Sequence, residues 1–348
     1  MDDLDGWDYW RGPIRRIASL CPLALALCMA LGLAPAALAA PAMPAMPAMP
    51  AQARAALAPA APSASGHVTV IVLDMSGSMA QNDPLGLRCS AAGAYVDLSG
   101  PSDFVGVVGL DNPNGATGGP RNFPTTIDWQ LPPRELSTVS ARQSLRAAIQ
   151  QKSNSCHPDG ATPTYDALTR AAAMLTAATK NGAIPGSVIL LTDGEPFPAT
   201  QEQQSAVTAD LVPQFKVHNW PVDVIALGAD SGFRGFLSGL ASATSGSLYD
   251  DGHGVVPGVS PLNITPFFLD IFRLRNGRSP GPDIEPTPLN GGAAGRNFTV
   301  GQFVKSLDIV VVKDSPSTRV TLVAPNGERF PPATAGTFVS TDPYYAIF

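Results

Sequence analysis

The sequence predicts an α/β protein with a doubly wound, mostly parallel sheet that carries helices on both faces. The first observation is a set of four apolar, mostly β-branched runs bounded by turn residues, at 68–73, 104–110, 188–191 and 222–227. Continuous apolar runs of this length suit strands that are buried on both faces. The second observation is that segments with helical periodicity separate the runs. Strands that alternate with helices indicate right-handed crossovers and hence a parallel sheet.

The helices are expected where apolar residues recur on one face. Two faces are clear in the sequence, one made of Ala141, Leu145, Ala148 and Ile149, the other of Leu168, Ala171, Ala172 and Leu175. Apolar residues at this spacing are typical of amphipathic helices. Further helices are expected over 201–216, 233–243 and 265–274. The Gly-, Pro- and Asn-rich segment 111–135 is expected to be a long loop with one short strand near 127–130.

The C-terminal part has a different period. Residues 277–296 are rich in Gly and Pro and are expected to be a linker. From 297 to 348 the apolar residues alternate with polar ones, which predicts strands at 303–312, 318–324, 337–340 and 344–348, with a turn at 325–327. We expect a small β-sandwich-like, Ig-like unit, or part of one. The last strand lacks a stop signal, so we expect either a truncated chain or a unit that pairs with something else.

The N-terminal part predicts export. Arg11, Arg15 and Arg16 precede an uncharged, apolar stretch that ends in the small-x-small site Ala37-Leu38-Ala39. We therefore interpret 1–39 as a signal peptide, which places the protein outside the cytoplasm, secreted, periplasmic or on the cell surface. The alternative is an uncleaved membrane anchor. Residues 40–66 are almost all Ala, Pro and Met and are interpreted as a linker, either a spacer or a passive connection.

The charge of the chain excludes one class of partner. The net charge is −6, and the chain has no long basic run. Binding to phosphate backbones requires clustered Lys and Arg, so nucleic acid is not expected as a partner. Binding to anionic lipid has equally little support, and contact with a membrane is expected only if the N-terminal segment stays uncleaved.

Oxygen-bearing side chains gather where the predicted strands end. The first apolar run leads directly into Asp74, Ser76 and Ser78, and the third leads into Asp193. A loop that opens the next helix adds the hydroxyl of Thr162. Because the carboxyl ends of strands in an open α/β sheet share one edge, we expect these five side chains to lie together.

The five donors predict the type of metal and its use. All are oxygen donors, which suits a hard divalent cation, Mg²⁺ or else Mn²⁺ or Ca²⁺, and not Zn²⁺ or Cu²⁺. Two carboxylates roughly balance the charge of such an ion, and the other three donors are neutral. The ion therefore stays electrophilic and is expected to accept one more anionic oxygen, for which an Asp or Glu of a protein partner is the natural candidate.

The arrangement resembles a known site. Asp74, Ser76, Ser78, Thr162 and Asp193 match the metal-ion-dependent adhesion site of von Willebrand factor type A domains and integrin inserted domains. The Gly-x-Thr-Pro-Thr pattern from Gly160 is similar to the bacterial branch, and the resemblance covers about 67–276. It implies a Rossmann-like fold and metal-mediated protein binding, often adhesion. In such sites the two Ser and the Thr usually contact the metal, while the two Asp often act through water.

Motifs of enzymes are lacking in the sequence. It has no Walker-type phosphate loop, no His-Glu-x-x-His and no Gly-x-Ser-x-Gly. We therefore expect a binding protein and no enzyme. Two alternatives stay open: an envelope scaffold whose metal only stabilises the fold, and a hydrolase that uses the metal to activate water.

Two of the four cysteines, Cys89 and Cys156, lie after the predicted cleavage site. An exported protein meets oxidising conditions, and only one intramolecular pairing is then possible. A disulfide between Cys89 and Cys156 and a pair of buried free thiols both remain open.

Overall fold

The computed structural model describes most of the chain after the N-terminal segment. The described residues are 66–112, 115, 117–125, 129–153, 160–180, 182–228, 231–250, 261–279, 289, 292–300, 307–330 and 342–348. The predicted signal peptide and all of the predicted linker at 40–66 except Gly66 therefore lie outside the described residues. Among the residues that are described, none of the helices is both long and apolar enough to cross a membrane.

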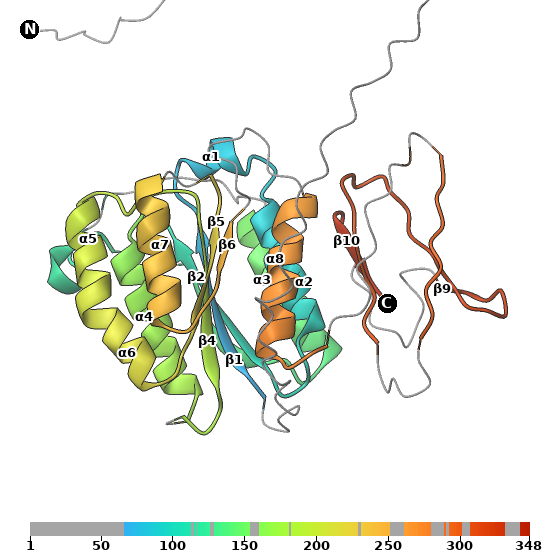
Figure 1. The fold of residues 1–348 in the computed structure, drawn as a ribbon, viewed down its shortest axis with the longest axis horizontal. Coiled ribbons are helices and arrows are strands. Elements are labelled where there is room, and N and C mark those ends of the chain that lie inside the picture. The colour runs from blue at the N-terminus through green and yellow to red at the C-terminus, as the bar shows by residue number, and fades with distance from the viewer. Residues whose placement is uncertain are drawn as a thin grey trace, which may run out of the picture. The chain divides into compact units, whose positions relative to one another are not determined.

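A six-stranded sheet forms the centre of the α/β domain (Figure 1), in the order β3-β2-β1-β4-β5-β6. Only β3 runs antiparallel, against β2. The strands are β1 (Val68–Asp74), β2 (Phe104–Leu110), β3 (Gln130–Glu135), β4 (Gly186–Thr192), β5 (Val222–Ala226) and β6 (Leu248–Asp250). The predicted doubly wound, mostly parallel sheet is thus confirmed. The strand expected near 127–130 begins at Gln130, and β6 was not predicted.

Helices cover both faces of the sheet (Figure 1). One face carries α2 (Leu87–Leu98), α3 (Val139–Ser153) and α8 (Pro261–Arg275). The other face carries α4 (Thr164–Ala178), α5 (Thr200–Ala206), the π-helical turn η3 (Val207–Leu211), α6 (Val212–Val217) and α7 (Ser231–Ala243). The single helix expected over 201–216 is therefore three consecutive segments. The short elements are α1 (Met79–Asn82) and the 3₁₀ turn η2 (Pro120–Asn122).

Strand β1 divides the core into two clusters. Ile71 and Leu73 pack towards the α2 and α8 side, while Val68, Val70 and Val72 pack towards α4. Side chains alternate between the faces of a strand, so a strand in mid-sheet needs apolar residues at every position. All seven residues of β1 are buried, which explains the unbroken apolar run in the sequence.

The C-terminal region forms small antiparallel sheets. Strand β10 (Tyr345–Ile347) pairs with β7 (Val310–Val312), and β8 (Leu322–Val323) pairs with β9 (Arg329–Phe330) across the predicted turn. The strand expected at 337–340 lies outside the described residues. Tyr345 and Ile347 belong to the core cluster on the α2 side. The end of the chain therefore packs into the α/β domain as well as pairing within its own sheet.

Candidate metal centre

Neighbouring strands bring the two predicted carboxylates to one edge of the sheet. Strands β1 and β4 are parallel neighbours with Leu73 opposite Leu191. Asp74 is the last residue of β1, and Asp193 follows directly after β4. Both side chains therefore lie at the carboxyl edge of the sheet, the end at which α1 follows β1 in Figure 1. This is the edge at which open α/β sheets bind their ligands.

Asp74 is fixed by hydrogen bonds to both of its carboxylate oxygens. The backbone N–H of Ser76 donates to Oδ1 over 2.8 Å, and the hydroxyl of Thr192 donates to Oδ2 over 2.6 Å. The side chain is fully buried. Burial raises the pKa of Asp74, because a carboxylate loses hydration energy when it leaves water. The chain thus holds this carboxyl in one orientation.

A relay of hydrogen bonds joins the β1 loop to Asp193. The hydroxyls of Ser76 and Ser78 are 3.0 Å apart, and Ser78 donates to Asp193 Oδ1 over 2.8 Å. The amide of Asn82, at the end of α1, donates to Asp193 Oδ2 over 2.8 Å. Four of the five predicted donors therefore lie in one connected cluster.

The cluster concentrates negative charge in a buried place. Asp193 is 6% exposed. Burial and then the negative charge of Asp74 raise the pKa of Asp193 to about 7. Two buried carboxylates that repel each other are costly unless a positive charge accompanies them. A divalent cation would offset this repulsion, and the residues present fit such an ion.

The loop that carries Thr162 is joined to the other two loops by backbone hydrogen bonds. Gly77 donates to the carbonyl of Gly160 over 3.2 Å. Thr162 and Phe197 exchange two hydrogen bonds, each 3.0 Å long. Thr162 is buried. All three loops that carry predicted donors are therefore fastened to one another.

The centre is exposed to solvent at the loop that follows β1. Asp74, Ser76, Thr162 and Asp193 are buried, whereas Gly77 and Ser78 are exposed. In the described part of the chain, no group of three or more His, Cys, Asp or Glu side chains is placed to hold a metal ion. A cation at this edge would therefore need the hydroxyl donors as well as the two carboxylates. A partner would approach it from the side of Gly77 and Ser78.

A buried ion pair contacts the loop that follows β1. Arg88 and Asp83 are both fully buried, and Arg88 Nη1 lies 2.7 Å from Asp83 Oδ2. Asp83 also accepts hydrogen bonds from the backbone N–H groups of Leu87 and Arg88, at the start of α2. Arg88 Nη2 lies 3.4 Å from the sulfur of Met75, in the loop that carries Ser76 and Ser78. The pair thus ties α2 to that loop.

Sequence reasoning missed the residues that orient the donors. Thr192 holds Asp74, and Asn82 holds Asp193. Both carried a weak signal, since Thr192 immediately precedes Asp193 and Asn82 lies one helical turn after Ser78. Nothing in their spacing distinguishes them from ordinary loop residues, because their role depends on which loop packs beside them.

Only one of the two cysteines after the predicted cleavage site lies within the described residues. Cys89 is buried in α2 and takes part in a disulfide. Cys156 lies outside the described residues, so the pairing of Cys89 with Cys156 stays a prediction.

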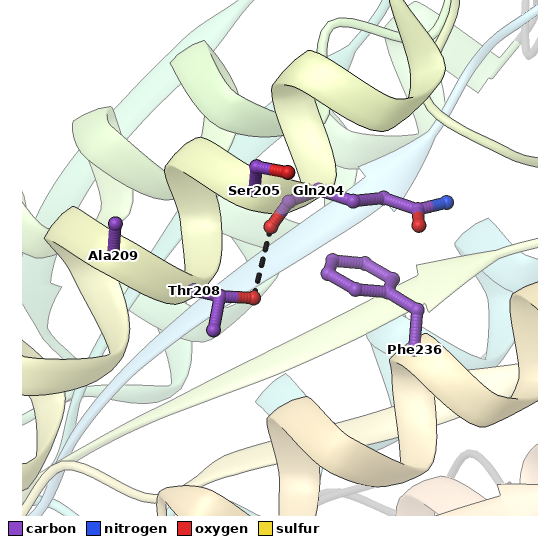
Figure 2. A pocket seen from close by; sticks show the side chains of 5 residues that line it. All are labelled: Gln204, Ser205, Thr208, Ala209 and Phe236. Atoms are coloured by element: carbon purple, nitrogen blue, oxygen red, sulfur yellow. Dashed lines mark hydrogen bonds between the residues drawn. The ribbon is translucent and has the colours of Figure 1, made fainter.

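A separate shallow cavity of about 430 Å³ lies between α5, η3 and α7 (Figure 2). Its lining consists of Gln204, Ser205, Thr208, Ala209 and Phe236. Thr208 donates its hydroxyl proton to the carbonyl of Gln204 over 2.9 Å. The lining has no titratable group and includes none of the predicted donors, so this cavity is distinct from the candidate metal centre.

Several solved structures resemble the chain at a distance. The pilus adhesin SpaC from Lactobacillus rhamnosus GG has 16% identity and a TM-score of 0.41, and the match covers 60% of this chain and 30% of SpaC. Human COPII-coat protein Sec24c has 13% identity and a TM-score of 0.46, with 60% and 32% covered. The SpRpn10 VWA domain has 13% identity and a TM-score of 0.37, with 58% and 93% covered. These similarities are too distant to indicate function.

The chain corresponds to only part of two of these proteins. The chain spans less than a third of the length of SpaC and of Sec24c. No curated protein matches the sequence. One family model does match: residues 69–195 fit the von Willebrand factor type A domain. These residues include all five predicted donors, and the mostly parallel sheet is the one that the resemblance implied; residues 69–195 are thus similar to a von Willebrand factor type A domain.

Proposed function

We propose that this chain is a metal-dependent protein-binding module of the adhesion type. In this proposal Asp74, Ser76, Ser78, Thr162 and Asp193 hold one divalent cation. The observation that carries the proposal is the buried cluster of two repelling carboxylates and two hydroxyls that opens to solvent at Ser78. A bound cation would supply an electrophilic centre that accepts a carboxylate oxygen from an Asp or Glu of a partner protein.

The chain's own residues prepare this centre. Thr192 and the backbone of Ser76 orient Asp74, and Asn82 orients Asp193. Such outer hydrogen bonds fix ligand orientation and typically contribute tenfold to about 100-fold in metal affinity. Oxygen donors alone favour Mg²⁺, with Mn²⁺ or Ca²⁺ as substitutes.

The proposal includes the setting of the protein. The apolar N-terminal stretch and the Ala/Pro/Met-rich linker support export, so that the domain acts outside the cytoplasm as a secreted, periplasmic or surface protein. We propose a binding protein and no enzymatic activity, because the sequence has no Walker-type phosphate loop, no His-Glu-x-x-His and no Gly-x-Ser-x-Gly motif. Neither nucleic acid nor anionic lipid fits the charge of the chain.

Calorimetric titration of the metal-stripped full chain with Mg²⁺, Mn²⁺ and Ca²⁺ tests the metal site. We expect one site per chain, and we expect an Asp74→Ala/Asp193→Ala double variant to lose it. A matched control is Glu135→Ala. Glu135 is exposed and pairs with Phe104 at the opposite edge of the sheet, so its removal should leave the titration unchanged.

The double variant must stay folded for this comparison, which circular dichroism checks. A folded wild-type chain that binds none of the three ions would refute the metal-dependent module. A chain that binds metal but has no position open to an outside carboxylate would instead favour an envelope scaffold with a structural metal.

A further inference from the structure

Three consecutive exposed apolar residues lie on the loop between β4 and α5. They are Phe197, Pro198 and Ala199, and we call them the apolar rim. Phe197 is 63% exposed. A single exposed apolar side chain is ordinary on a soluble protein, but a run of three is unfavourable unless it contacts something.

The apolar rim lies beside the candidate metal centre. Phe197 and Thr162 are directly opposite each other in an antiparallel bridge and exchange both of their backbone hydrogen bonds. Directly opposed residues of an antiparallel pair direct their side chains to the same face, with Cβ atoms about 5 Å apart. The ring of Phe197 is therefore the lateral neighbour of a proposed metal donor, and it stands in solvent where that donor is buried.

The backbone of the apolar rim is held firmly. Gln203 is fully buried, and its amide donates to the carbonyl of Pro198 over 2.6 Å while its oxygen accepts from the backbone N–H of Tyr165 over 3.1 Å. Thr200 donates to the carbonyl of Pro196 over 2.7 Å. Ala199 adopts a φ of 62°, a left-handed conformation that costs an alanine about 1 kcal/mol.

A Phe side chain has only two rotatable bonds, so on a backbone that is already held it loses little conformational entropy on binding, and Phe is among the aromatic residues that are enriched at protein interfaces. The fold thus keeps Ala199 in a strained backbone conformation and holds the neighbouring carbonyl groups by hydrogen bonds. The segment held in this way exposes an apolar contact surface. Burial of an apolar partner group against this surface would remove the unfavourable exposure.

We propose that the apolar rim is a second contact for the partner, which recognises a large apolar side chain next to the carboxylate. This inference rests on the proposed function, because the carboxylate is placed by the metal. The spacing sets the pattern. An extended peptide advances about 3.3 Å per residue, so the residue that reaches Phe197 lies within two positions of the Asp or Glu.

Peptide binding to the immobilised, Mg²⁺-loaded full chain tests the inference. Three pools of seven-residue peptides serve as probes: one with a central Asp and Leu or Phe at each of the two positions on either side, one with Ser at those four positions, and one with Asn in place of the Asp of the first pool. Each pool is measured on the wild type, Phe197→Ser, Phe197→Leu and Val217→Ser. Val217 is 78% exposed at the end of α6 and serves as the matched control.

We expect the apolar Asp pool to bind the wild type about tenfold more tightly than the Ser pool, in keeping with burial of one apolar contact. Phe197→Ser should abolish this preference, whereas Phe197→Leu and Val217→Ser should retain it. The Mg²⁺ affinity of Phe197→Ser should equal that of the wild type, which separates the contact from the metal centre.

Two results would overturn the inference in different ways. If the apolar and Ser pools bound equally and the Asn pool did not bind, the apolar rim would not be a contact for the partner, while the proposed function would stand. Equal binding of the Asp and Asn pools would refute the role of the carboxylate, and with it the proposed function on which the inference rests.

Discussion

At the scale of single residues, the two aspartates oppose stability in the absence of metal. Asp74 and Asp193 are buried, their pKa values are raised, and they repel each other. Their hydrogen-bond partners are neutral, and the positive charge of Arg88, which lowers both pKa values, is itself paired with Asp83. Groups that are kept at a cost in stability are typical of functional sites.

Asp193→Asn should therefore separate stability from metal binding. We expect the metal-free variant to gain about 1 kcal/mol of stability, because one buried charge is removed and the Asn82 amide can rotate to keep its hydrogen bond. Metal affinity should fall at least about 100-fold, beyond the usual effect of losing an outer-sphere partner. Urea unfolding and calorimetric titration measure the two quantities. A variant that loses stability yet keeps its metal affinity would contradict this account.

His67 gives a pH dependence that is independent of the metal centre. Burial and then the positive charge of Arg275 lower the pKa of His67 from 6.5 to about 4. Its Nε2 lies 2.8 Å from the hydroxyl of Ser187, and its backbone N–H donates to Asp103. The folded state keeps the ring neutral, while the unfolded chain takes up a proton below pH 6.5. Stability is therefore complete above pH 6.5 and falls as the pH falls towards 4.

The loss should reach up to about 3 kcal/mol by pH 4, and about 2 kcal/mol at pH 5. Urea unfolding at pH 7.5 and pH 5.0 measures it. His67→Gln should have a smaller difference between the two pH values than the wild type. Identical pH dependence in the wild type and His67→Gln would show that His67 does not titrate in this range.

At the scale of elements, the buried strands were predictable because each forms an unbroken apolar run. Helix α2 was not predicted for a related reason: all twelve of its residues are buried, so no polar face marks its period. Its Arg88 and Asp97 suggest solvent exposure in the sequence, but each is paired with an opposite charge in the structure. Strand β6 has only three residues and is too short to show a pattern.

The last strand is attached to α2 by a buried hydrogen bond. The hydroxyl of Tyr345 donates to Asp97 Oδ2 over 2.7 Å, and Arg146 lies 3.2 Å from the same oxygen. Ser90 of α2 also donates to Asp342. Two helices of the α/β domain, α2 and α3, thus hold the chain end through charged groups that are removed from solvent.

Tyr345→Phe should cost about 1–3 kcal/mol, because it deprives a buried carboxylate of a hydrogen bond while preserving the packing of the ring. Tyr344→Phe is the matched control. Tyr344 is half-buried next to the same strand, and its variant should change stability by less than about 0.5 kcal/mol. Equal effects of the two substitutions on the urea midpoint would mean that the bond to Asp97 does not attach the strand.

At the scale of the whole molecule, the sequence predicted the edge of the sheet at which the donors meet, since Asp74 and Asp193 directly follow buried strands. It did not predict how three separate loops are fastened together, because the bonds between Gly77 and Gly160 and between Thr162 and Phe197 are backbone contacts that carry no side-chain signature. Nor did it show that Tyr345 and Ile347 complete the core on the α2 side, since pairing over long sequence separation leaves no local pattern.

These bonds between loops make the candidate metal centre depend on the entire fold. The donors come from loops that follow β1 and β4 and from the loop that precedes α4, so a bound cation would join segments more than a hundred residues apart in sequence. Gly77 and Ser78 form the exposed part of the centre. Their loop is hydrogen-bonded to the loop of Thr162, which is in turn hydrogen-bonded to Phe197 of the apolar rim. Cation binding and partner binding are therefore expected at one face of the molecule.

The most direct test of the central claim is the proton relaxation of water in the presence of the full chain loaded with Mn²⁺, followed by addition of acetate. We predict one Mn²⁺ per chain whose water exchanges rapidly with solvent, and a fall in relaxation as the carboxylate displaces that water. The Asp74→Ala/Asp193→Ala variant should behave as buffer does. Bound Mn²⁺ with no exchangeable water, or relaxation that acetate does not change, would contradict a centre built to accept a partner's carboxylate.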